Sequence, residues 1–117
     1  MQGVPDTHIE RYEEQLLSET RGTLRIRLRF ADQAVLEISE ALVLMVGEPQ
    51  WLSYRYHYQD PSAVLVFRYD NAPHHREIST HPDHKHAGEH VVASQHPSLE
   101  QVLLEVRDFR TRTEKHS

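Results

Sequence analysis

The stretch TLRIRLRF, residues 23–30, decides the fold class, because apolar and polar residues alternate in it without a break. Side chains of a β-strand point alternately to its two faces, so the pattern predicts a strand that buries one face and exposes the other. The exposed face would carry Arg25, Arg27 and Arg29. We therefore predict a sheet with one basic, solvent-facing side.

Three further strands are predicted downstream of this one. Residues 31–33 form a plausible turn into AVLEISEALVLM, residues 34–45. After a break at residues 47–49, WLSYRYHYQ alternates again, and its tyrosines share one face. The turn Asp60-Pro61-Ser62 then leads into AVLVFRY, the returning strand of a hairpin. Strands joined by such short connections predict an antiparallel meander.

Both ends of the chain carry helical patterns. Thr7 and Glu10 have the spacing of a capping box, and the apolar residues after them predict a helix over residues 7–18. Ser98 and Gln101 have the same spacing, and an apolar stripe predicts a second helix that ends near Arg110. REIST, residues 76–80, could be one more short strand, and residues 113–117 are expected to fray.

These elements predict one α+β domain over residues 1–117. Its antiparallel sheet would have about four to six strands, with N- and C-terminal helices packed on one face. The chain has no cysteine, which excludes thiol catalysis and disulfide frameworks. It shows no signal peptide and no apolar stretch long enough to span a membrane, so we expect a cytoplasmic protein.

The charge pattern argues against a general nucleic-acid coat, because the net charge is -5. Positive charge is nevertheless concentrated locally, with four arginines in residues 21–29. Such a basic strand could dock RNA or an acidic segment of a partner protein. An arginine-rich composition is also common in GC-rich genomes, and that interpretation stays open.

Histidine is concentrated in NAPHHREISTHPDHKHAGEH, residues 71–90, which hold six of the ten histidines. If HKH is extended, His84 and His86 project to one side and Lys85 to the other. Alternation likewise places Arg55 with His57, and Arg68 with Asp70, on single strand faces. Whether these pairs meet depends on the strand register, which the sequence does not fix.

Two chemistries suit this cluster. His84 and His86, with His81, Asp83 or His74, could supply the ligands of a zinc ion, although the spacing matches no metalloprotease motif. Alternatively, RNA cleavage through the 2′-hydroxyl needs a base, an acid and a cation, which histidine, arginine and lysine provide without a cofactor. The groups available are His57, His74, His75, His84, His86, Arg55, Arg68 and Lys85.

Some of the conspicuous residues have a structural alternative. Any single histidine of the cluster is as readily a hydrogen-bonded structural residue, and we interpret His8, His90, His96 and His116 as ordinary polar surface. Tyrosines can stack on exposed bases. At strand spacing they more often form a half-buried core, and we favour that for Tyr54, Tyr56, Tyr58 and Tyr69.

The strings YRYHYQD, VFRYDNAPHHREIST and PDHKH, followed by PSLEQVL, resemble the TumE-like toxins of bacterial and archaeal toxin–antitoxin modules. The resemblance covers about residues 51–106. It falls on His57, Arg68, Asp70, Asn71, His74, His75, His84, Lys85 and His86. The chain departs from the family pattern at Asp83, where a histidine is usual, and at His81, where an aromatic residue is usual, so neither is counted as essential.

The resemblance implies a toxin that acts on RNA and is paired with a helix-turn-helix antitoxin. We expect a metal-independent endoribonuclease without a cofactor or a metal ligand. Its expected catalytic residues are His74, His75, His84, His86, Lys85, Arg68, His57 and Asp70, and its expected substrate-binding residues are Arg55, Asn71 and Tyr69. The alternative is a non-enzymatic, histidine-rich module that binds a metal or a partner.

Overall fold

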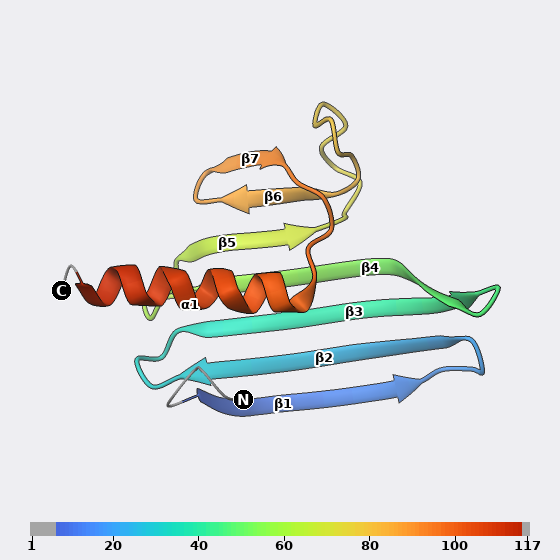
Figure 1. The fold of residues 1–117 in the computed structure, drawn as a ribbon, viewed down its shortest axis with the longest axis horizontal. Coiled ribbons are helices and arrows are strands. Elements are labelled where there is room, and N and C mark those ends of the chain that lie inside the picture. Colours follow the sequence, from blue (N-terminus) through green and yellow to red (C-terminus); the bar gives the residue numbers. More distant parts are fainter. Residues whose placement is uncertain (1–6, 116–117) are drawn as a thin grey trace.

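The computed structural model describes residues 7–115, which form one seven-stranded antiparallel sheet and one helix (Figure 1). The elements are β1 (Thr7–Leu16), β2 (Arg21–Phe30), β3 (Val35–Met45), β4 (Glu48–Gln59), β5 (Leu65–Asp70), β6 (His84–Ala87), β7 (His90–Ala93) and α1 (Leu99–Lys115). Strands pair in chain order from β1 to β7. The predicted α+β meander is thus confirmed, with more strands than the four to six expected.

The turn between β3 and β4 shows how the sequence sets the connections. Val46 and Gly47 both have positive φ angles, 54° and 78°. A two-residue hairpin turn with two positive φ angles is of type I′, whose twist matches that of the flanking strands. Glycine adopts this conformation without a steric penalty, which explains why the chain reverses at the break predicted from Gly47.

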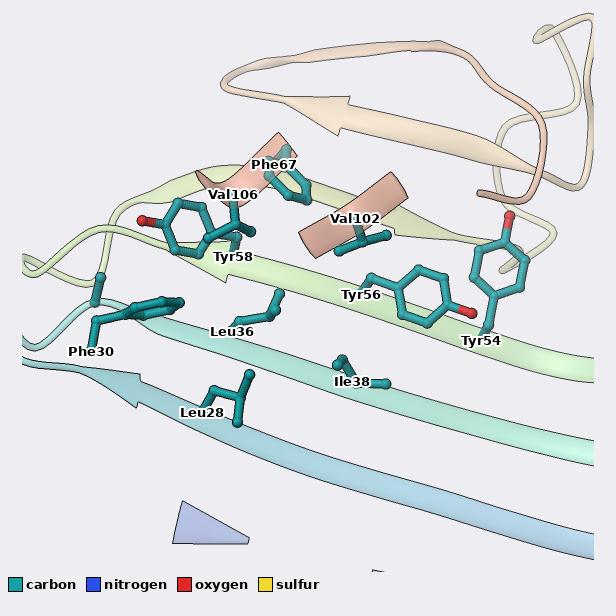
Figure 2. Packing of buried hydrophobic residues seen from close by; sticks show 11 residues of the cluster. Leu28, Phe30, Leu36, Ile38, Tyr54, Tyr56, Tyr58, Phe67, Val102 and Val106 are labelled. Atoms are coloured by element: carbon teal, nitrogen blue, oxygen red, sulfur yellow. The ribbon is translucent and has the colours of Figure 1, made fainter. Parts of the chain in front are cut away.

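The core lies between α1 and one face of the sheet, called here the helix face (Figure 2). Tyr54, Tyr56 and Tyr58 of β4 point into it, and Val102 and Val106 of α1 pack against them. The tyrosine stripe is therefore core, as favoured from its spacing. The opposite side is called the open face, because no helix covers it in the described residues (Figure 1).

Capping fixes the start of α1. The Ser98 hydroxyl accepts the amide proton of Gln101 (3.1 Å), and the Gln101 side chain accepts that of Ser98 (2.8 Å). The predicted capping box is confirmed, because both residues satisfy amides that the first turn leaves unpaired. The helix continues to Lys115, beyond the end expected near Arg110. Residues 113–115 belong to α1, and residues 116–117 lie outside the described residues.

The predicted N-terminal helix is wrong, because residues 7–16 form strand β1. Ile9 lies opposite Leu28 and Tyr12 opposite Ile26, and a β-bulge separates the two pairs. The bulge inserts one residue, so side chains three positions apart reach the same face of the sheet. The spacing of apolar residues that predicted a helix is thus produced by a strand with a bulge. Glu10, in the bulge, bonds Arg27 (3.0 Å) and Arg29 (2.6 Å) of β2 instead of capping a helix.

The expected short strand at residues 76–80 is also absent, because this segment belongs to a loop of successive turns between β5 and β6. The amide of Ile78 bonds the carbonyl of His75, and the amide of His81 bonds the carbonyl of Ile78. These local bonds use backbone groups that a strand would offer to a neighbour. The loop instead brings His75 back toward the start of β6.

Candidate active site

The strand register joins the polar residues of the open face into two rows that cross the sheet. In the first row, Arg55 of β4 lies opposite Asp70 of β5, and Asp70 lies opposite His84 of β6. In the second row, His57 of β4 lies opposite Arg68 of β5, and Arg68 lies opposite His86 of β6. The face-sharing pairs predicted from alternation therefore meet, because the two antiparallel registers align them.

Three histidines converge at the β6 end of these rows. The Nε2 atoms of His84 and His86 are 3.1 Å apart, so both side chains project to one side of β6, as predicted. The loop adds His75, whose ring centroid lies 4.9 Å from that of His84 and 5.5 Å from that of His86. We call His75, His84 and His86 the histidine cluster.

Asp70 lies beneath the cluster and connects its members. Its Oδ1 is 3.0 Å from His84 Nε2 and accepts the amide proton of Ala72 at 2.9 Å. Its Oδ2 is 3.6 Å from His86 Nε2 and accepts from Arg68 Nε at 3.2 Å. Because the Asp70 side chain is only 10% exposed, these partners satisfy a carboxylate that would be costly to bury alone. Asp70 therefore orients both the turn and the histidines.

The three histidines differ in their access to solvent. The His84 side chain is 2% exposed, and its Nδ1 lies 2.9 Å from the carbonyl oxygen of Pro82. The Nδ1 of His84 donates to this carbonyl, and its Nε2 faces both Asp70 Oδ1 (3.0 Å) and His86 Nε2 (3.1 Å). The side chains of His86 (18%) and His75 (29%) are more accessible. A substrate can therefore reach His75 and His86 but not His84.

The cluster can also hold a cation. One ring nitrogen from each of the three histidines lies within 4.8 Å of the others. Zinc is commonly bound by imidazole nitrogens and carboxylate oxygens in a tetrahedron. Neither His81 nor Asp83 belongs to this group, because His81 Nδ1 faces the His75 carbonyl and Asp83 accepts the Tyr54 hydroxyl. The zinc set weighed from the sequence is therefore replaced by one that includes His75.

Burial and positive charge lower the pKa of two histidines of the open face. Burial lowers the pKa of His86, and the neighbouring Arg68 lowers it further. Burial likewise lowers the pKa of His57, whose Nε2 lies 2.9 Å from Gln59 Oε1. The Nδ1 of His57 is buried and has no hydrogen-bond partner in the described residues. Both rings therefore favour the form that can accept a proton.

A shallow hollow of about 470 Å³ adjoins the cluster. Arg55, Arg68 and Asp70 line its floor, and residues 71–73 of the loop form one side. Asn71 closes this corner, since its side chain accepts from the amide of Tyr54 (3.1 Å) and donates to the carbonyl of Leu52 (3.3 Å). The hollow offers arginine side chains next to histidines, a combination suited to a phosphate group.

Several residues expected at the site lie elsewhere. Lys85 and Tyr69 are on the helix face, where both bond Glu105 of α1, at 2.6 Å and 2.5 Å. They are therefore separated from the cluster by the thickness of the sheet. His74 is exposed in the loop and is not one of the three histidines whose ring nitrogens lie within 4.8 Å of one another.

The prediction that His96 is ordinary polar surface is wrong. His96 stacks on Tyr54 with ring centroids 3.7 Å apart, and it bonds the Tyr56 hydroxyl at 2.9 Å. It thus helps to hold the segment before α1 on the helix face. No periodicity signals this role, because residues 94–98 belong to no helix or strand. His116 lies outside the described residues.

Comparison with known proteins identifies the family. A family model described as Toxin TumE matches residues 5–114, which include both the histidine-rich segment and the N-terminal strands that precede the resemblance over residues 51–106. Comparisons with curated proteins and with solved structures gave no match. No helix of the described residues is long and apolar enough to cross a membrane. Since the match spans nearly the whole chain, the protein belongs to the TumE toxin family.

Proposed function

We propose that this toxin cleaves RNA through the 2′-hydroxyl and that the histidine cluster is its catalytic centre. The observation that carries the proposal is the convergence of His75, His84 and His86 on Asp70 and Arg68, on a face that α1 leaves open. Membership of a toxin family implies a cognate antitoxin. We propose a helix-turn-helix protein in that role and RNA of the cytoplasm as the target.

His86 is the proposed base. Its lowered pKa, caused by burial and by Arg68, keeps the ring neutral near pH 7, as a base requires. Removal of the 2′-hydroxyl proton lets that oxygen attack the adjacent phosphorus. The bond from phosphorus to the 5′-oxygen then breaks, and the products end in a 2′,3′-cyclic phosphate and a 5′-hydroxyl.

His75 is the proposed acid. It is the most exposed histidine of the cluster, and it reaches the centre from the loop rather than from the sheet. In protonated form it would give its proton to the departing 5′-oxygen. Base and acid would thus come from two different segments of the chain, strand β6 and the loop before it.

Arg68, His84 and Asp70 have supporting roles in this proposal. Arg68 is held by Asp70 through Nε (3.2 Å), which leaves its terminal nitrogens to meet charge on the phosphate. His84 is too buried to contact RNA, and it acts as a positioning residue between Asp70 and His86. We place His57 in the same category, because it lies opposite Arg68 on β4.

The experiment measures cleavage of a structured RNA by tag-free protein in the presence of a chelator. We expect cleavage to persist there, because histidines alone supply the proton transfers. The matched control is His90→Ala, since His90 is an exposed histidine of β7 outside the cluster. RNA that stays intact under every condition in which the protein is folded would contradict the proposal.

A second candidate, a metal-binding module, is favoured by one specific observation. The cluster nitrogens lie within 4.8 Å of one another, and the Pro82 carbonyl orients His84 as metal-bound histidines are commonly oriented. Metal analysis after dialysis separates the two. Stoichiometric zinc that is lost in His84→Ala, together with no cleavage of RNA, would favour the module. Cleavage by protein from which metal has been removed would eliminate it.

A further inference from the structure

A second hollow lies on the open face, between β2 and β4. It has a volume of about 200 Å³ and is lined by Arg11, Arg25, Ile26, Arg27, Glu37, Ile38, Ser39 and Arg55. Four of these residues are arginines and only one is acidic. Such an excess of guanidinium groups around a concave surface concentrates positive potential and favours an anion.

Within residues 7–115, two of these arginines form no ion pair, although the register places Glu13 opposite Arg25 and Asp70 opposite Arg55. Arg27 is paired with Glu10 and Glu37, and Arg11 lies 3.4 Å from Glu13. Arg25 and Arg55 form no ion pair and no side-chain hydrogen bond in the described residues. Their donors are therefore available to a ligand, unlike those of the neighbouring arginines.

The register places these two arginines around a hydroxyl. Arg25 lies opposite Ser39, and Ser39 lies opposite Arg55. All three side chains belong to the first cross-strand row, which continues through Asp70 to His84. Two forked donors flanking a hydroxyl can surround the non-bridging oxygens of a phosphodiester, because guanidinium matches phosphate in a bidentate manner.

Arg55 connects this hollow to the one beside the histidine cluster, because it lines both. From β6, which carries His86, to β2 there are four strand intervals of about 4.8 Å, or about 19 Å in all. That span corresponds to about six nucleotides at the stacked rise of roughly 3.4 Å, and to fewer if the strand is extended. Because Arg55 lines both hollows, we favour for the second hollow the proposed ligand of the cluster, a nucleic-acid backbone, over an acidic protein segment.

We propose that Arg25, Ser39 and Arg55 form a phosphate-binding subsite, which holds the backbone of single-stranded RNA across the sheet on one side of the cleavage point. The choice of RNA as the polymer rests on the proposed function, whereas the anion site rests on the arginines themselves. The substrate would run perpendicular to the strands, from His86 across β5, β4 and β3 to β2.

The test measures binding of a fluorescein-labelled 2′-O-methyl oligouridylate by fluorescence anisotropy at several salt concentrations. This probe lacks the 2′-hydroxyl, so binding is observed without cleavage. We expect Arg25→Gln and Arg55→Gln each to weaken binding about tenfold. Each should also lower the slope of log K against log salt by about 0.7, the value for one phosphate contact on a single strand. The control is Arg107→Gln, an exposed position of α1 on the other side of the sheet, which should bind as the wild type does.

The outcomes separate the subsite from the proposed function. Arginine-dependent binding by a protein that cuts no RNA would support the subsite and refute the cleavage mechanism. Cleavage of RNA together with unchanged binding in Arg25→Gln and Arg55→Gln would overturn the subsite alone. Unchanged oligonucleotide binding together with loss of the antitoxin complex in these variants would also overturn it, because the arginines would then serve a protein partner.

Discussion

The two faces of the sheet are built from the same strands but carry opposite kinds of side chain. On β4, Tyr54, Tyr56 and Tyr58 are buried under α1, while Arg55 and His57 alternate with them on the open face. The alternation of a strand thus separates packing from chemistry at neighbouring positions. We therefore expect substitutions on the helix face to alter the free energy of unfolding and substitutions on the open face to alter function.

The largest effect is expected from the accessible histidines of the open face. His75→Ala and His86→Ala should each lower RNA cleavage by about 10²- to 10⁴-fold, the usual contribution of general acid–base catalysis. Thermal unfolding should remain at the wild-type temperature, because neither side chain belongs to the core. Single-turnover cleavage and circular dichroism measure the two quantities. Near-wild-type cleavage rates in both variants would show that the histidines of the open face are not catalytic.

The next largest effect is expected on the helix face. Leu36 is fully buried, so Leu36→Ala should lower the free energy of unfolding by about 2–5 kcal/mol. Chemical denaturation measures this change, and cleavage by the folded fraction should keep its wild-type rate constant. A loss of stability much smaller than that range would show that the sheet does not depend on packing against α1.

Arg68 and Lys85 allow the open face and the helix face to be compared directly, because they occupy adjacent strands on opposite faces. Arg68→Met removes a charge beside the cluster and should lower cleavage by at least about tenfold. Lys85→Met breaks the ion pair with Glu105 and should lower the free energy of unfolding by about 1 kcal/mol. Parallel rate and denaturation measurements on both variants test the expectation. A larger loss of rate in Lys85→Met than in Arg68→Met would reverse the assignment of the faces.

Alternation explains which parts of this structure could be predicted from sequence. It correctly gave the meander, the tyrosine core and the shared faces of Arg55 with His57 and of His84 with His86. Alternation also implies that Lys85 points away from these histidines, although the positive charge of Lys85 led to its prediction as a catalytic residue. Only its place on the face opposite these histidines follows from alternation, and its contact with Glu105 of α1 does not.

The remaining features depend on contacts that periodicity does not encode. The bulge at residue 10 of β1 gave helical spacing to a strand, and only pairing with β2 reveals it. The selection of His75 over His74 depends on how a loop of successive turns folds back over β6. The roles of His96 and Asn71 likewise arise from tertiary contacts.

The smallest expected effect concerns pH and the helix face. Burial lowers the pKa of His96, so the folded protein binds its proton less readily than the unfolded chain does. Stability from this group is therefore present above the unfolded pKa of about 6.5, and it is lost as pH falls from that value through the lower pKa of the folded protein. Burial lowers the pKa of His57 and His86 as well, and both add to the loss in the same direction.

The test compares the free energy of unfolding of wild type and His96→Phe across this pH window. Phenylalanine retains an aromatic ring against Tyr54 but carries no titrating group, so the variant should lose less stability on acidification. The lowered pKa values of Glu10 and Glu77 act only at more acidic pH and do not interfere. Equal slopes in the two proteins would show that His96 does not contribute.

We propose that the open face cleaves RNA through the 2′-hydroxyl. The chemical ends of the RNA products give the most direct test of this proposal. Mass spectrometry of fragments produced by tag-free wild-type protein in chelator, with His86→Ala as the paired sample, identifies these ends. We predict 2′,3′-cyclic phosphate and 5′-hydroxyl ends in the wild-type sample and intact RNA in the variant. Fragments with 3′-hydroxyl and 5′-phosphate ends, or the same fragments in both samples, would contradict the account.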